Sequence, residues 1–254
     1  MKIGLALSGG AVRGMAHIGV LKYLEESNIK IDIIAGTSAG SLVAALHAAG
    51  KSAEEIEEIV LDINWKDIAK NIYNASFPKK GLINIEILEE IIENSLGNVS
   101  FEELKKPLIV VAVDLGENRA VHIKSGEVTS AIMASCAMPG IFTPVERDGK
   151  LLFDGGVLQN IPTVPLKEEG IEIIIAVDLS ARTAYAGTPG NIFEILFKTL
   201  YLMAREKEKE DKKLASFLIE PELGDIGLWQ LDKSKELITL GYKEAQKVLG
   251  KAKI

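Results

Sequence analysis

The stretch IIAGTSAGSLVAAL, residues 33–46, changes from an apolar run typical of a buried strand to helical spacing at a single serine. The turn between the two parts matches G-x-S-x-G, the pattern of a nucleophile elbow, with Ser38 at its centre. Bulk at Gly36 or Gly40 would collide with the adjoining strand and helix in so sharp a turn. We therefore predict that Ser38 is an exposed nucleophile, against the alternative of a serine N-cap beside two incidental glycines.

Apolar runs alternate with amphipathic segments along the rest of the chain. Buried strands are predicted at residues 2–7, 31–36, 108–115 and 171–179, and helices at 12–27, 41–50, 52–62, 85–96, 127–137, 190–213 and 232–249. Such alternation favours a three-layer α/β/α fold with a mostly parallel central sheet. A hairpin is predicted within residues 145–153. Because no linker or repeat interrupts the 254 residues, we expect a single domain over residues 1–254.

Composition narrows the class of protein. The formal net charge of −7 argues against nucleic-acid binding and against simple adsorption to an anionic membrane, but leaves open contact of a local patch with a membrane surface. The single cysteine, Cys136, excludes an internal disulfide and fits a reducing compartment. The N-terminal apolar run is too short for a signal peptide, and no stretch has the length of a transmembrane helix. We therefore expect a cytoplasmic protein that is at most peripheral at the membrane.

A second glycine-rich turn, in LALSGGAVRGMAHIGVL (residues 5–21), also joins a predicted strand to a helix. Gly9, Gly10 and Gly14 permit close approach to the backbone, where successive N–H groups form an anion-binding nest. Such a nest suits either a nucleotide phosphate or the oxyanion of a tetrahedral intermediate. We favour an oxyanion hole, because the P-loop and dinucleotide-binding registers are absent and a serine nucleophile is predicted elsewhere.

A serine nucleophile needs a base that takes its proton. The chain has three histidines, His17, His47 and His122. His47 lies on the predicted helix that follows Ser38, roughly 13 Å along its axis and out of reach, and the other two are expected to pack or to be solvated. A carboxylate remains: Asp154 follows a short strand and precedes Gly155 and Gly156, and partial burial would raise its pKa. The alternative is that Asp-Gly-Gly forms a plain turn.

Three motifs, SGGAVRG, GTSAG and DGG, together resemble the patatin-like phospholipases. The resemblance continues through SCAMPGIFTPV and DGGVLQNIP, and more weakly toward the C-terminus, so that it spans nearly the whole chain. It implies a serine–aspartate dyad without histidine, in which Ser38 is the nucleophile and Asp154 its base. It also implies that no metal or other cofactor is needed.

The resemblance further implies that the turn Gly9–Gly10–Ala11 supplies the oxyanion N–H donors and that Arg13 supports this loop. This chain departs from the family at one position. The family usually has a third glycine where this sequence has Ala11. A methyl group leaves the N–H available but restricts φ, which predicts either a tighter loop or a narrower acyl pocket.

The activity implied is that of an acyl hydrolase, which would cleave fatty-acyl esters of phospholipids or lysophospholipids through an acyl-enzyme. An acyltransferase using the same dyad, and a non-catalytic lipid- or nucleotide-binding regulatory module, are the alternatives. Two segments are candidates for lipid contact. Residues 62–82 are predicted to form a cap on the core or a lid. Residues 191–213 are predicted to form a helix whose apolar face packs on the core. Aromatic side chains widen this face, and the alternatives for its widened part are the lining of an acyl pocket and contact with a partner.

Overall fold

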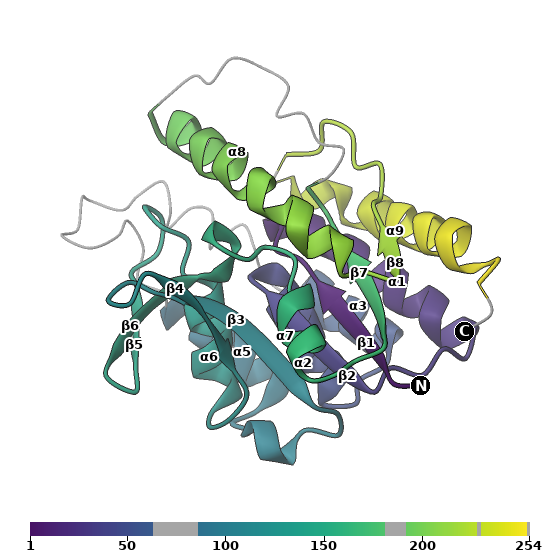
Figure 1. Cartoon of the computed structure of the whole chain (residues 1–254), viewed down its shortest axis with the longest axis horizontal. Helices are drawn as coiled ribbons and strands as arrows, with labels where there is room; N and C mark the ends of the chain where they lie inside the picture. Colours follow the sequence, from purple (N-terminus) through teal and green to yellow (C-terminus); the bar gives the residue numbers. More distant parts are fainter. Residues whose placement is uncertain (63–85, 181–191, 228–229, 253–254) are drawn as a thin grey trace.

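The computed structural model describes residues 1–62, 86–180, 192–227 and 230–252 (Figure 1). Within these ranges, one eight-stranded sheet has the order β5-β6-β3-β2-β1-β7-β8, with β4 also paired to β3. The strands are β1 (Ile3–Leu7), β2 (Ile33–Thr37), β3 (Leu108–Asp114), β4 (Arg119–Ile123), β5 (Val145–Arg147), β6 (Lys150–Asp154), β7 (Ile173–Val177) and β8 (Phe217–Ile219). The candidate lid at 62–82 lies, apart from its first residue, outside the described residues.

Parallel pairing dominates the sheet. β1 pairs in parallel with β2 and β7, β2 with β3, and β7 with β8. β4, β5 and β6 add an antiparallel corner beside β3. The three central strands, β1, β2 and β3, are almost entirely buried, as their continuous β-branched and aliphatic composition predicts. The mostly parallel α/β sheet predicted from the sequence is therefore confirmed.

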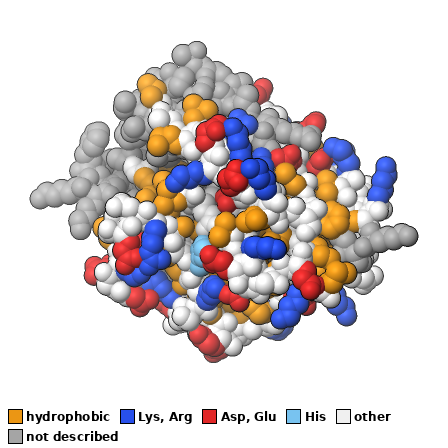
Figure 2. Space-filling model, in the orientation of Figure 1, with side chains coloured by type: hydrophobic (Ala, Val, Ile, Leu, Met, Phe, Trp, Pro, Cys, Tyr) orange, Lys and Arg blue, Asp and Glu red, His pale blue; other side chains and the backbone are white. Residues whose placement is uncertain are grey.

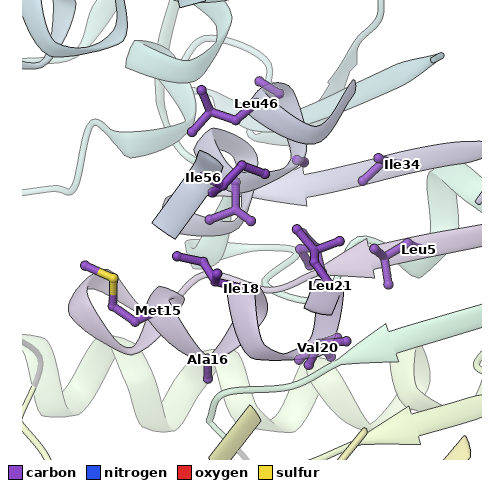
Figure 3. Packing of buried hydrophobic residues seen from close by; sticks show 14 of the residues in the cluster. Leu5, Met15, Ala16, Ile18, Val20, Leu21, Ile34, Leu46 and Ile56 are labelled. Carbon is purple, nitrogen blue, oxygen red and sulfur yellow. The ribbon is translucent and has the colours of Figure 1, made fainter. Parts of the chain in front are cut away.

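Helices cover both faces of the sheet. They are α1 (Met15–Glu26), α2 (Ala39–Ala48), α3 (Ala53–Asp62), α5 (Glu86–Leu96), α6 (Val128–Cys136), α7 (Thr163–Glu168), α8 (Ile192–Lys213) and α9 (Ser234–Leu249). The larger core joins α1, α2, α3, α6 and α9 to one face of the strands. Figure 3 shows part of it, where Ile18 and Leu21 of α1 pack with Leu5 and Ile34 of the sheet. Each such fully buried side chain contributes about 1.5–3 kcal/mol to the free energy of unfolding.

The second core, on the other face, is smaller. It contains Ala6, Ala35 and Ala176 of the sheet together with Leu166 of α7, and small side chains let the covering segments approach the strands closely. Figure 1 shows α7 and α8 on this side, in front of β1 and β7. α8 reaches the carboxyl ends of the strands on this face, where α/β proteins place their functional sites.

The structure differs from the sequence prediction at two short elements. Neither α7, six residues long, nor β8, three residues long, was expected, because each is too short for a periodic apolar pattern. The predicted hairpin is present as β5 and β6, with Asp148 and Gly149 between them at positive φ. In the described part of the chain, none of the helices combines the length and the apolar character needed to cross a bilayer.

Candidate active site

Two strands that run toward each other bring the predicted nucleophile and carboxylate together. β2 pairs with residues 108–111 of β3, and β6 pairs with residues 112–114. β4 pairs along residues 110–114 and overlaps both, so β2 and β6 must share the opposite edge of β3. Because β2 is parallel to β3 and β6 is antiparallel, their carboxyl ends face each other. Ser38 follows one end and Asp154 is the other end.

The turn after β2 has the geometry of an elbow. Ser38 has φ 50° and ψ −127°, an unusual conformation for a residue with a side chain, and α2 begins at the next residue. A Cβ on Gly36 would lie 2.5 Å from Ser41 Cα, and one on Gly40 would lie 2.3 Å from the carbonyl oxygen of Leu7. The two glycines therefore let strand, turn and helix pack at contact distance, as the sequence pattern predicts.

The Ser38 hydroxyl is directed at the predicted carboxylate. Ser38 Oγ donates a hydrogen bond of 2.8 Å to Asp154 Oδ2. The other carboxylate oxygen, Oδ1, accepts a hydrogen bond of 2.8 Å from the N–H of Gly156. A Cβ on Gly155 would lie 2.4 Å from the carbonyl oxygen of Val111, so the Asp-Gly-Gly turn lies directly against β3. Asp154 is thus both the first residue of this turn and the predicted base, and the glycines fix the orientation of its carboxylate.

Burial adjusts the basicity of this carboxylate. Asp154 is only 5% exposed. Ser38 is 7% exposed, so the expectation of an exposed nucleophile is wrong, because the Gly9 loop and Asp154 pack against it. Removal from water raises the pKa of Asp154 from its ordinary 3.8 to about 6, although the hydrogen bonds from Gly156 and Ser38 act in the opposite direction. A carboxylate with this pKa is a stronger base than a solvated aspartate and remains largely ionised at neutral pH.

All three histidines lie in the described residues, and each has its contacts elsewhere. His17 Nε2 lies 2.8 Å from the carbonyl oxygen of Ser8, and burial lowers its pKa to about 4. His47 contacts Lys106, and His122 lies between Gln159 and Glu168. The hydroxyl of Ser38 is paired with a carboxylate and not with an imidazole.

The glycine loop lies against Ser38, the predicted nucleophile. A Cβ on Gly9 would lie 3.1 Å from the Cβ of Ser38. The N–H of Gly9 donates to Asn160, to Oδ1 at 3.1 Å and to the main-chain oxygen at 3.3 Å. For the N–H groups of Gly10 and Ala11, the described ranges of the chain provide no acceptor within hydrogen-bonding distance. Of the three predicted oxyanion donors, Gly9 is therefore anchored to the protein and the other two are available.

Arg13 anchors the glycine loop to a segment near the C-terminal helix. Its side chain is 3% exposed, and Nε and Nη2 donate to the carbonyl oxygen of Ile226 at 2.9 and 2.7 Å. The guanidinium therefore ties the 3₁₀ turn Ala11–Gly14 to the segment before α9. Gly14 lets this turn approach the elbow, because a Cβ there would lie 2.9 Å from that of Ala39. These contacts fit the supporting role that the family resemblance implies for Arg13.

Replacing Ala11 by glycine is expected to raise the free energy of unfolding by roughly 0.5–1 kcal/mol. Ala11 has φ 48°, the left-handed region in which a Cβ is strained and glycine is not. Chemical denaturation measures the change. Ala16→Gly is the matched control, because Ala16 lies in the regular helix α1 and its replacement should lower stability by about 1 kcal/mol. Equal losses in both variants would contradict strain at Ala11.

Other side chains at the site were not predicted from the sequence. Ser135 of α6 accepts the N–H of Ser38 at 2.8 Å and donates to the carbonyl oxygen of Val111 at 2.6 Å, joining the elbow to β3. Asn160 holds Gly9, as described above. Both residues lie in the quoted family motifs, SCAMPG and LQNIP. That position is the only signal in the sequence, because neither residue shows a spacing of its own that points to the site.

A buried serine at a strand–helix elbow, paired with a buried carboxylate beside an N–H-rich loop, is the arrangement typical of serine acyl hydrolases. The patatin-like phospholipase family model matches residues 5–167, which run from β1 into α7 and include Ser38 and Asp154. The chain belongs to the patatin-like phospholipase family.

Individual relatives agree with this assignment. An uncharacterized NTE family protein of Mycobacterium tuberculosis is 35% identical over 183 residues, 72% of this chain and 50% of its own length. Lysophospholipase NTE1 of Pyricularia oryzae is 25% identical over 98% of this chain and 18% of its own length. The chain thus spans about half the length of the mycobacterial relative and less of the fungal one. VipD of Legionella pneumophila, 13% identical, has the same fold with a TM-score of 0.60, covering 98% of this chain and 66% of VipD.

Proposed function

We propose that this chain is a serine acyl hydrolase that cleaves fatty-acyl esters of phospholipids or lysophospholipids. The observation that carries the proposal is the 2.8 Å hydrogen bond from Ser38 Oγ to the buried Asp154 Oδ2. Family membership supports the reaction class, and the lysophospholipase activity in the name of the fungal relative supports the substrate class.

In the proposed mechanism, Ser38 Oγ attacks the acyl carbonyl carbon while Asp154 takes the hydroxyl proton. The carbonyl oxygen becomes an oxyanion, which the N–H groups of Gly10 and Ala11 stabilise. The start of α2 adds positive potential beside Ser38. When the intermediate collapses, Asp154 returns the proton to the departing alcohol oxygen, and the acyl group remains on Ser38. Water, deprotonated by the same carboxylate, then attacks the acyl carbon, and Asp154 returns this proton to Ser38 Oγ as the fatty acid leaves.

We also propose transient contact with a lipid surface. Three large hydrophobic side chains of α8 are exposed, Ile195 at 47%, Leu202 at 54% and Met203 at 66%. In Figure 2, a few hydrophobic side chains border the grey atoms in the upper part of this face, and hydrophobic side chains and charged ones of both signs share the rest. Exposed apolar area of this kind suits an interfacial substrate better than a freely dissolved one. The cytoplasmic location stays a proposal, supported by the single Cys136.

Release of fatty acid from lysophosphatidylcholine, measured below and above its critical micelle concentration, tests the activity and the surface contact together. We expect hydrolysis in both ranges and a rise in rate per substrate molecule once micelles form. Transfer of the acyl group to an added alcohol or to a second lysolipid molecule, in place of release as fatty acid, would favour an acyltransferase. Complete absence of hydrolysis and of reaction with a fluorophosphonate would contradict the proposal and favour a non-catalytic binding module.

A further inference from the structure

The glycine loop is connected to α8 by a continuous run of hydrogen bonds. The N–H of Gly9 donates to Asn160 Oδ1 at 3.1 Å, and Asn160 Nδ2 donates to Glu208 Oε1 at 2.8 Å. Ser180 Oγ lies 2.8 Å from Glu208 Oε2 and 2.6 Å from Asp178 Oδ1. Glu208 comes from α8, is 2% exposed, and is the only member of this run on that helix. Burying an acidic side chain lowers the free energy of unfolding unless the carboxyl group is fully hydrogen-bonded. The burial of Glu208 therefore calls for an explanation beyond packing.

The chemistry of the partners fixes the orientation of the amide. A backbone N–H can only donate, so the atom of Asn160 that faces Gly9 must be the oxygen. The side chain of Glu208 presents an acceptor to the other end of the amide, which must therefore be the nitrogen. Without Glu208, the amide nitrogen would be left without an acceptor, and the oxygen would no longer be held toward Gly9.

The number of protons available to Ser180 and its two carboxyl neighbours decides which group donates in each hydrogen bond. The hydroxyl of Ser180 has a single proton, yet it contacts two carboxyl groups at hydrogen-bonding distance. Asp178 has Lys212 Nζ as its ion-pair partner at 2.5 Å, which leaves Glu208 as the group to supply the second proton. Burial, followed by the charge of Asp178, raises the pKa of Glu208, in agreement with this assignment. Each member then donates to the next, from Gly9 through Asn160 and Glu208 to Ser180 and Asp178.

We propose that Glu208 is a positioning residue that acts through Asn160 to hold the glycine loop in register with Ser38. The inference rests on the proposed function, because it treats the N–H groups of Gly10 and Ala11 as oxyanion donors. Gly9 is the anchored residue of the loop, and the two N–H groups after it are oriented by that anchor. α8 thereby contributes to the site although none of its described side chains is paired with the dyad.

Three single variants test the proposal with p-nitrophenyl butyrate, a soluble ester. Glu208→Met removes the acceptor at similar volume and is expected to lower kcat roughly 10- to 100-fold, with KM within about twofold. Glu208→Gln should stay within about threefold of wild type, because its amide oxygen accepts from Asn160 and its nitrogen donates to Ser180. Glu206→Gln is the matched control on the exposed face of α8, where Glu206 pairs with Lys209, and should change nothing. Active sites are counted by fluorophosphonate titration, so that unfolded protein does not lower the apparent kcat.

A double-mutant cycle separates action through the amide from independent action. Asn160→Ala should lower kcat about as much as Glu208→Met, and combining the two should cost no more than Asn160→Ala alone. Losses that multiply, or wild-type kcat in Glu208→Met, would overturn the proposal. A Glu208→Gln variant as impaired as Glu208→Met would overturn it as well, since the orientation would then not depend on the acceptor.

Amide hydrogen exchange provides a measurement that does not depend on turnover. Glu208→Met should accelerate exchange of the Gly9 N–H at least roughly tenfold relative to wild type, and Glu206→Gln should not. Unchanged exchange would contradict the anchoring role of Glu208 whatever the activity. If the wild-type chain neither hydrolyses the ester nor reacts with a fluorophosphonate at Ser38, the proposed function fails, while the exchange result still decides whether Glu208 holds the loop.

Discussion

Replacing Ser38 by alanine is expected to lower the turnover of a fatty-acyl ester by roughly ten-thousand-fold or more. The variant lacks the oxygen that would form the acyl-enzyme, and no other hydroxyl is hydrogen-bonded to Asp154 within the described residues. The fold should persist, because the elbow is held by main-chain contacts, including the hydrogen bond from the N–H of Ser38 to Ser135 Oγ. Steady-state hydrolysis and circular dichroism on the same preparation measure both effects.

The matched control for this variant is Ser41→Ala. Ser41 is also a fully buried serine of the elbow, and its hydroxyl donates to the carbonyl oxygen of Ser38 at 2.6 Å. Its loss should cost about 1 kcal/mol of stability and leave at least a tenth of the activity. Treatment with a fluorophosphonate should add one adduct to the wild type and to Ser41→Ala, and none to Ser38→Ala. Retention of a tenth of wild-type turnover by Ser38→Ala would show that the nucleophile has been misassigned.

Much of the fold could be predicted from local pattern. The continuous apolar runs of β1, β2, β3 and β7 indicate strands buried on both faces, and the intervening amphipathic segments supply the covering helices. The elements that were missed have a common physical cause. α7 and β8 are too short to show a period, and what stabilises them is burial against the sheet, as for Leu166 of α7 in the second core. Burial of this kind is a property of the assembled structure and not of the segment alone.

The residues of the candidate site also fall into two groups, those that adjacent residues predict and those that depend on the assembled structure. Ser38 could be predicted because a nucleophile elbow needs small residues on both sides of the serine, and Gly36 and Gly40 are visible beside it in the sequence. The two glycines after Asp154 also indicate a tight turn, but its pairing with Ser38 depends on β2 and β6 meeting end to end along β3. The contact between Asn160 and Glu208 joins residues 48 positions apart, and no spacing rule connects them. Setting the three histidines aside left Asp154 as the candidate base and the family resemblance implied its pairing with Ser38, whereas only the structure supplied the contact between Asn160 and Glu208.

The second large effect is expected for Asp154→Asn, which should lower turnover roughly a thousand-fold or more. The structure indicates which way the new amide would face. The N–H of Gly156 donates to the Oδ1 position, so the amide oxygen must occupy that side and the nitrogen must face Ser38 Oγ. A donor would then stand where the proton acceptor is required. The substitution preserves the shape of the side chain and reverses its function toward the hydroxyl.

Stability should move in the opposite direction. Because the folded-state pKa of Asp154, about 6, lies above its ordinary 3.8, the folded state binds this proton more tightly than the unfolded state. The contribution of Asp154 to the free energy of unfolding is therefore full below about pH 4 and is lost as the pH rises through about 6. At pH 8 a neutral amide avoids that loss, so Asp154→Asn should have a higher Tm than wild type. Higher stability with abolished turnover separates a chemical role from a structural one.

The pH dependence of the wild type provides an independent measure of the same group. If ionised Asp154 is the base, kcat/KM should decline on the acidic side with an apparent pKa of about 6, the value that burial gives this carboxyl in the free protein. An imidazole base would give a similar limb, since its unperturbed pKa is about 6.5, so the profile needs the histidine variants beside it. His122→Gln is the most informative, because the His122 ring is hydrogen-bonded to the polar side chains of Gln159 and Glu168 and can be replaced with little cost to the core. The His122→Gln variant should keep both its turnover and the decline of kcat/KM on the acidic side, whereas Asp154→Asn should lose both. A folded His122→Gln as inactive as Ser38→Ala, alongside an active Asp154→Asn, would leave the elbow in place and transfer the role of base to the imidazole.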